Sequence, residues 1–131
     1  MEAEARIRAY FAACTDGAAE DIAAHFTPGA TIYDTNHRPV RGSGSIGGFW
    51  VQVRERWGGA AWFLDTCVSC GEAAAIEWTM TGEQPRRFVV RGSEHYRFEG
   101  DDRRIAEIRQ YWTFDPNRLD TGLVEYRYGE P

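Results

Sequence analysis

Hydrophobic positions in the first 57 residues recur every three to four places, which is the spacing of one face of a helix. The pattern predicts three helices, and each is followed by residues that end helices: Asp16-Gly17, Pro28-Gly29 and Gly58-Gly59. The apolar faces of the three helices are Ile7, Tyr10, Phe11 and Cys14, then Ala19, Ile22, Ala23 and Phe26, then Ile46, Phe49, Trp50, Val53 and Trp57.

After residue 60 the period changes to two, as in half-buried strands. The alternation predicts strands at about 61–70, 73–81, 86–99 and 103–114, in addition to a short strand at 30–34 between the second and third helices. Helices first and consecutive hairpins afterwards indicate an α+β domain, with three N-terminal helices packed on one face of a strongly curved antiparallel sheet. The sheet and helices are expected to enclose one apolar pocket.

The 131 residues fit one domain, with a core at about 5–114 and a polar tail after Pro116. We expect that tail to cover a sheet edge or a dimer partner. A homodimer is expected through the outer face of the sheet, which Arg87, Arg91 and Arg97 share with Val89.

Two polar side chains interrupt the inward faces of the predicted strands. Glu94 falls on the face that carries Val90, Tyr96 and Phe98, where a carboxyl group is costly unless it is paired, protonated or used in chemistry. Gln110 is the odd polar residue on the inward face of the last strand, which is otherwise Ala106, Ile108, Trp112 and Phe114.

Composition narrows the possible partners. The net charge of −5 argues against nucleic acid and against an anionic membrane surface, and no window is apolar enough for a signal peptide or a membrane span. All fifteen basic residues are Arg, so lysine Schiff-base chemistry is excluded. Three cysteines are too few for a disulfide framework, which suits the cytoplasm.

Three local patterns resemble cofactor-binding or metal-binding motifs but lack the structural surroundings that those motifs require. Residues 42–47 spell GxGxxG but follow no apolar parallel strand, so Ser43 or Ser45 is better interpreted as a helix N-cap. Cys67 and Cys70 lie three apart on a strand and therefore point to opposite faces. The three histidines are scattered. We therefore expect neither a cofactor nor a metal.

Several segments taken together resemble the nuclear transport factor 2-like superfamily, in its SnoaL-like and ketosteroid-isomerase-like branch. The matching segments are AYFAAC, HFTPGATIYD, VRGSGSIGGFW, VVRGSEHYRFEGD and RIAEIRQYW, which stand in the family's order over about residues 5–114. The resemblance implies a cone-shaped α+β barrel that binds a small molecule.

In the steroid-isomerase branch, a Tyr of the first helix and an acid on a long strand form an oxyanion hole, and an Asp at the end of the first strand moves the proton. These positions match Tyr10, Glu94 and Asp34 of this chain, with Glu replacing the branch's Asp. The polyketide-cyclase and epoxide-hydrolase branches often carry an Asp in the last strand, where this chain has Gln110.

The expected function is cofactor-independent proton transfer on a small apolar carbonyl compound, such as a polyketide or steroid-like metabolite. Asp34 would be the base, and Tyr10 and a protonated Glu94 the donors. The substrate would contact Gln110, Trp78, Tyr96, Trp112, Phe49, Trp50 and His37. Two alternatives stay open: a non-catalytic small-molecule-binding or dimerisation module, and an Asp34 that only begins an Asx turn.

Overall fold

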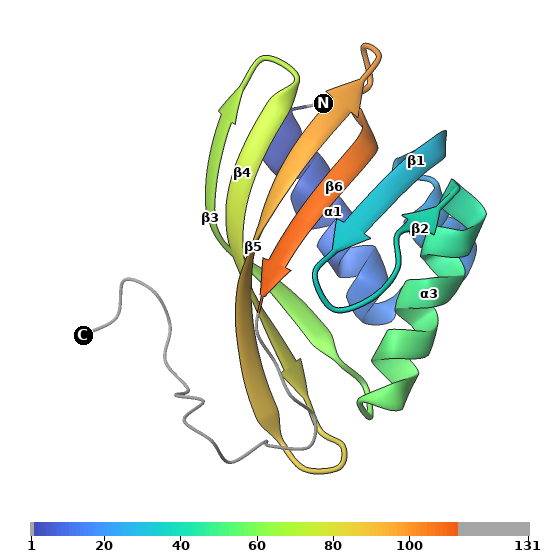
Figure 1. The fold of residues 1–131 in the computed structure, drawn as a ribbon, viewed down its shortest axis with the longest axis vertical. Coiled ribbons are helices and arrows are strands. Elements are labelled where there is room, and N and C mark those ends of the chain that lie inside the picture. Colours follow the sequence, from blue (N-terminus) through green and yellow to red (C-terminus); the bar gives the residue numbers. More distant parts are fainter. Residues whose placement is uncertain (1, 113–131) are drawn as a thin grey trace.

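The computed structural model describes residues 2–112, where the expected helices and strands occur in the predicted order, together with a two-residue strand at 40–41 that was expected to be loop (Figure 1). The elements are α1 (Ala3–Asp16), α2 (Ala19–Ala23), β1 (Phe26–Asp34), β2 (Val40–Arg41), α3 (Ser43–Arg56), β3 (Ala61–Cys70), β4 (Ala73–Gly82), β5 (Phe88–Glu99) and β6 (Arg104–Trp112). The expectations for Phe114 and for the tail after Pro116 lie outside the described residues. None of the described helices is long and apolar enough to cross a membrane.

The six strands form one sheet in the order β2-β1-β6-β5-β4-β3. The hairpins β3–β4, β4–β5 and β5–β6 are antiparallel, as predicted, but β1 pairs with β6 in parallel. The prediction of a wholly antiparallel sheet is therefore wrong at this one pair. The reason is topological, since the chain crosses from β1 through α3 and three hairpins before β6 returns beside it.

Two boundaries also differ from the sequence prediction. Phe26 is the first residue of β1 rather than the last of the second helix, because α2 already ends at Ala23. The expected side-chain N-cap of the third helix is absent, since Gly42 occupies that position with φ of +90° and no side chain bonds there. Gly42 is suited to the position because its conformation is strained for other residues.

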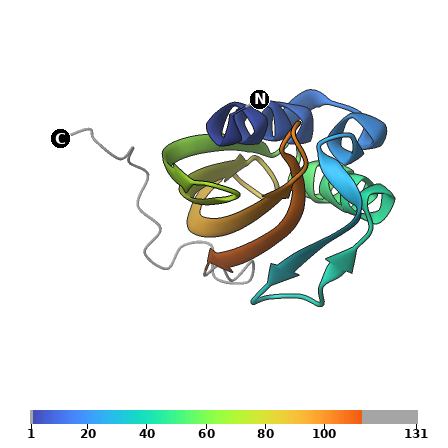
Figure 2. The ribbon, with the colours of Figure 1, turned by 90° about the horizontal axis from the view of Figure 1, so that it is seen from above.

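The helices cover the concave side of the sheet, as Figures 1 and 2 show together. Helix α1 packs mainly against β3, while α3 packs against β1 and α2. The largest fully buried side chains of this core include Tyr10, Phe26, Phe98, Ile7 and Ile22. Arg54 of α3 donates to the backbone oxygens of Cys14 and Gly17, so it satisfies carbonyls at the end of α1.

The predicted inward faces of β4, β5 and β6 are confirmed over most of their length. Glu94, Tyr96 and Phe98 are buried and alternate with exposed neighbours. A bulge between Arg97 and Phe98 shifts the register with β6. It accounts for two successive buried residues at the start of β6, Ile105 and Ala106. Val89, which was expected on the outer face, is buried.

Candidate active site

The sheet register builds a row of polar side chains across three neighbouring strands. Parallel pairing of β1 with β6 sets Asp34 opposite Gln110, and antiparallel pairing of β6 with β5 sets Gln110 opposite Glu94. All three side chains are on the concave side with the core, and Gln110 therefore separates the two carboxyl groups. The order Asp34–Gln110–Glu94 depends on the parallel pair that the sequence pattern did not predict.

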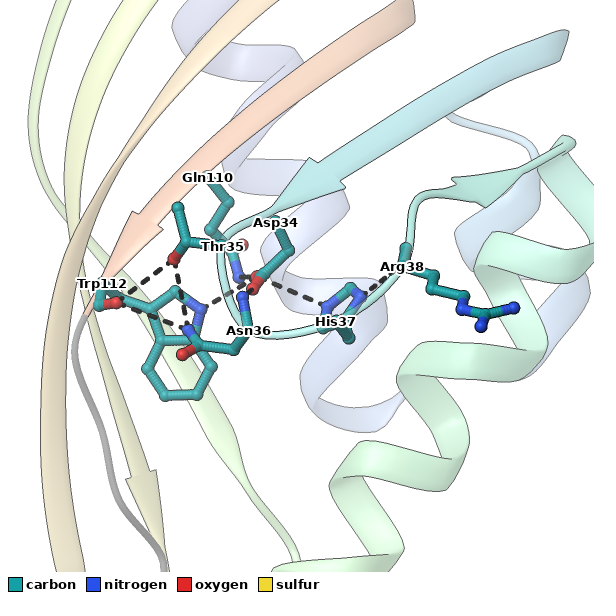
Figure 3. Close-up of polar contacts among 7 residues, drawn as sticks. All are labelled: Asp34, Thr35, Asn36, His37, Arg38, Gln110 and Trp112. Carbon is teal, nitrogen blue, oxygen red and sulfur yellow. Dashed lines mark hydrogen bonds and ion pairs between the residues drawn. The ribbon is translucent and has the colours of Figure 1, made fainter.

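Four groups converge on the Asp34 carboxylate, whose side chain has no exposed surface (Figure 3). Oδ1 accepts a hydrogen bond of 2.7 Å from the backbone N–H of Asn36, which is an Asx turn. Oδ2 accepts from Gln110 Nε2 at 2.5 Å and from Trp112 Nε1 at 2.9 Å. His37 Nε2 lies 3.4 Å from the same oxygen. Asp34 is thus both a turn residue and the centre of a cluster of three hydrogen-bond donors, from Asn36, Gln110 and Trp112.

The loop after Asp34 is fastened to the end of β6. Thr35 Oγ1 and Asn36 Nδ2 both donate to the backbone oxygen of Trp112, at 3.5 and 3.4 Å. The His37 Nδ1 lies 2.8 Å from the backbone oxygen of Arg38, which can only accept, so this nitrogen carries a proton. The ring therefore turns Nε2 toward Asp34 and one face toward Phe49, with 4.8 Å between ring centroids.

A second row of the register is aromatic. Gly92 of β5 pairs with Trp112 on one side and with Trp78 on the other. A Cβ on Gly92 would lie 2.5 Å from Trp78 Cζ2 and 2.8 Å from the Tyr111 carbonyl oxygen. Glycine therefore leaves the space in which the Trp78 ring lies, 6.2 Å from the ring of Trp112 between centroids. The two indoles form one wall of a cavity.

This cavity has a volume of about 300 Å³ and mostly aromatic walls. That volume lies within the range of small-molecule sites. The residues expected there that do line it are His37, Phe49, Trp50, Trp78, Gln110 and Trp112. Sequence reasoning missed Trp62, Met80, Val53, Trp57, Arg56 and Asn36. The inward alternation of β4 already pointed to Met80, and the apolar stripe of α3 to Val53 and Trp57.

Tyr10 and Glu94 do not face this cavity. They line a smaller inner space of about 10 Å³, which shares Trp50, Trp62, Trp78 and Gln110 with the main cavity. A space of that size holds about one water-sized atom. The two spaces adjoin at these four side chains, so the inner one is a recess behind the aromatic wall.

Glu94 is 2% exposed, and its Oε1 accepts a 2.9 Å hydrogen bond from the Tyr96 hydroxyl. Burial raises the pKa of Glu94 to about 8, the nearby Asp34 charge adds to the rise, and the Tyr96 hydrogen bond opposes it. Glu94 is therefore mostly protonated at neutral pH and has a proton to donate. Burial also raises the pKa values of Tyr10 and Tyr96 well above 10, so both stay neutral.

The structure thus brings the predicted site residues together in two groups. Asp34 lies behind His37, Gln110 and Trp112 and does not itself line the main cavity, whereas Tyr10 and Glu94 line the inner recess. Tyr96 lies behind Glu94, stacked on Phe98 with 5.8 Å between ring centroids, and lines neither space. Residues 2–112 contain no group of three or more His, Cys, Asp or Glu side chains placed to hold a metal ion.

A family model described as a SnoaL-like domain matches residues 7–108, and the chain therefore belongs to the SnoaL-like domain family. The expected resemblance and fold class are confirmed by this match and by the solved structures that the fold resembles. None of the curated proteins matches the chain significantly.

Three solved structures illustrate how widely this fold is shared. A protein of unknown function with a cystatin-like fold from Methylobium petroleophilum PM1 is 29% identical, with a TM-score of 0.76 over 86% of this chain and 76% of its own. A hypothetical protein with a ketosteroid-isomerase-like fold from Catenulispora acidiphila DSM 44928, in complex with trimethylamine, is 19% identical, with a TM-score of 0.75 over 82% of this chain and 85% of its own. A putative SnoaL-like polyketide cyclase from Jannaschia sp. CCS1 is 15% identical, with a TM-score of 0.71 over 83% of each chain.

Proposed function

We propose that this protein is a cofactor-independent enzyme that transfers a proton on a small apolar carbonyl compound. The observation that carries the proposal is the position of Asp34 Oδ2, a fully buried carboxylate oxygen directly behind three side chains that line an aromatic cavity. Gln110, Trp112 and His37 face that oxygen and also line the cavity. A substrate in the cavity would therefore meet the base as soon as one of these side chains turned away.

The chemistry follows from the two groups of residues. Asp34 takes a proton from the carbon next to the carbonyl, and the electron pair of that C–H bond moves to the carbonyl oxygen. Hydrogen-bond donors at the recess, Tyr10 and the protonated Glu94, stabilise the developing negative charge. Return of the proton to another carbon gives isomerisation, and loss of a β-hydroxyl, which leaves as water with that proton, gives dehydration. Attack of the enolate carbon on a second carbonyl gives cyclisation. Polyketide or steroid-like metabolites satisfy these demands.

One observation favours the second candidate, a non-catalytic small-molecule-binding module. Both oxygens of Asp34 already accept hydrogen bonds, and its side chain has no exposed surface. In that case the donor cluster would only fix the loop that closes the cavity.

Deuterium exchange distinguishes the enzyme from the binding module, because it detects proton transfer even when the product is unknown. The protein is incubated in D₂O with 1-tetralone, 2-tetralone or 1-indanone, and loss of the α-proton signal is followed by NMR. We expect exchange above the buffer rate for a compound that binds. Asp34→Asn should lower the exchange rate by about 10²–10⁴, which is the usual contribution of a positioned base. Binding of these ketones with exchange only at the buffer rate would support the binding module instead.

A homodimer through the outer face of the sheet is also proposed. Tyr111 of β6 and Tyr33 of β1 are exposed there at 49% and 37%, large aromatic surfaces of the kind enriched at interfaces. Arg109 pairs with Tyr33, and Arg97 lies further along the same exposed face, so the interface would be polar and weakened by salt. Sedimentation at micromolar concentration should show a dimer that dissociates as salt rises, and a monomer under all conditions would refute it.

A further inference from the structure

Two indole N–H groups next to the inner recess have no hydrogen-bond partner among residues 2–112. They belong to Trp78, which is 3% exposed, and Trp50, which is 6% exposed, and both side chains line the recess and the main cavity. Leaving a buried donor unpaired costs about 1–3 kcal/mol. A folded protein keeps such a donor when it has a use, and the recess is the space that both indoles border.

Trp78 is held in this position by its neighbours. Its ring lies in the space left by Gly92, and the Trp112 ring lies 6.2 Å from it between centroids. The indole cannot turn its N–H toward another acceptor without leaving that space. Trp50 differs, because its N–H faces the Tyr10 oxygen closely enough to lower the pKa of that hydroxyl, although no hydrogen bond of normal geometry forms. Trp78 is therefore the clearer unpartnered donor.

The other polar groups at the recess can also donate. Tyr10 has its hydroxyl there, and Glu94 is a buried carboxyl group whose Oε1 already accepts from Tyr96. A recess of about 10 Å³ bordered by these groups has room for one oxygen atom and little else. The main cavity beside it is walled by aromatic rings, which suit a flat ligand.

We propose that the Trp78 indole N–H donates a hydrogen bond to a substrate oxygen in the recess, and so selects planar aromatic compounds that carry one neutral ring carbonyl. The inference rests on the proposed function only in taking the cavity as the substrate site. A neutral oxygen is preferred to a carboxylate because the Asp34 carboxylate lies on the polar row next to that of Trp78. In this role Trp78 determines specificity, whereas Asp34 carries out the proton transfer.

The test uses two probes that differ only at the acceptor, 1-tetralone and tetralin. With ¹⁵N-labelled tryptophan, each indole N–H gives one NMR signal, assigned from single Trp→Phe variants. We expect 1-tetralone to shift the Trp78 signal downfield, as hydrogen bonding does. Tetralin, which has no acceptor, should not cause this downfield shift. The wild-type protein should bind 1-tetralone more tightly than tetralin, and Trp78→Phe should reduce this preference by about 2- to 10-fold, the worth of one hydrogen bond.

Trp62→Phe is the matched control. Trp62 lines both spaces, but its indole nitrogen is not among the buried donors without a partner, so the preference for 1-tetralone should survive. The proposal is overturned if both probes shift the Trp78 signal alike, if neither does, or if neither binds at its solubility limit. A different result would show that the proposed function is wrong. Preference for 1-tetralone without α-proton exchange would leave the Trp78 assignment intact and refute the enzyme.

Discussion

Glu94 is a carboxyl group buried at 2% exposure, and its burial has a free-energy cost that depends on pH. Its neighbours across the sheet are Ile76 and Gln110, and its own strand adds Tyr96, the hydrogen-bond donor to Oε1. With a pKa of about 8 in the folded protein and about 4.3 in the unfolded chain, the folded state holds the proton more tightly. The free energy of unfolding therefore falls as pH rises between these two values.

Glu94→Gln should remove this dependence. The amide does not titrate but still offers an oxygen to Tyr96, so the fold is expected to persist. Between about pH 5 and pH 8 the wild-type protein should lose roughly 1.4 kcal/mol per pH unit relative to the variant, an upper value for one fully buried group. Urea unfolding of both proteins across this range measures the difference. Glu99→Gln, an exposed carboxyl on the same strand, should behave as the wild type, and a parallel course for Glu94→Gln would show that Glu94 is ionised in the fold.

For single residues, the sequence predicted the burial of Glu94 better than it predicted which side chains lie around it. Strict alternation along β5 is a local property, so the position of Glu94 among apolar residues could be read directly. Trp62 could not be assigned to the site in this way. It lies near one end of β3, where the alternation of exposure is irregular. Tyr96 lies on the inward face, as predicted, yet Glu94 occupies the space in front of it.

Among the elements, helix α3 contains two adjacent glycines in different surroundings. A Cβ on Gly47 would overlap the backbone oxygen of Ala19 in α2, whereas a Cβ on Gly48 would meet nothing within 4 Å. Gly47 thus permits the close approach of α2 and α3, and Gly48 has no such function.

The two alanine variants should therefore change stability in opposite directions. Gly48→Ala is expected to stabilise the protein by about 0.5–1 kcal/mol, because alanine loses less conformational entropy in a helix. Gly47→Ala should destabilise it by about 1–3 kcal/mol, because the two helices must move apart. Denaturant unfolding of both variants gives the comparison directly. Stabilisation by Gly47→Ala would mean that the contact between α2 and α3 is loose.

The site depends on one element pairing that no local pattern contains. Asp34 reaches Gln110 because β1 lies parallel to β6, and 75 residues separate these two positions along the chain. Periodicity gives the face of each strand but not its neighbour, so the hairpins could be predicted and this pair could not. The resemblance to the SnoaL-like family supplied the grouping of Tyr10, Asp34 and Glu94. It did not supply the aromatic wall that divides them.

Over the whole molecule, Arg6 joins the first helix to segments far along the chain. Its guanidinium donates to the backbone oxygens of Asp102 at 2.7 Å and Arg103 at 3.1 Å, in the turn between β5 and β6. Nη1 lies 3.0 Å from His25 Nδ1, just after α2. Because arginine only donates, His25 must accept at Nδ1 and be neutral there.

Protonation of His25 should therefore break this connection. Burial, and then the charge of Arg6, lower the pKa of His25 below its ordinary value of 6.5. Below about pH 6.5 the unfolded chain binds this proton before the folded protein does, so the free energy of unfolding falls as the pH decreases. Arg6→Met should cost about 1.5–3 kcal/mol at pH 7.5, because charged hydrogen bonds are lost. It should also flatten the acid decline, since the like charge beside His25 is gone.

Urea unfolding at about pH 7.5, 6.5 and 5.5 measures both effects. The pH dependence that Glu94 adds to the free energy of unfolding cancels in the comparison, because every protein compared contains Glu94. Arg8→Met is the control. Arg8 lies on the same helix but is exposed, and it pairs with Glu4 at 3.8 Å, so its loss should cost about 0.5 kcal/mol or less. Equal stability of the two variants at pH 7.5 would show that Arg6 does not hold the helix to the sheet. An unchanged acid decline in Arg6→Met would show that burial alone opposes the charge on His25.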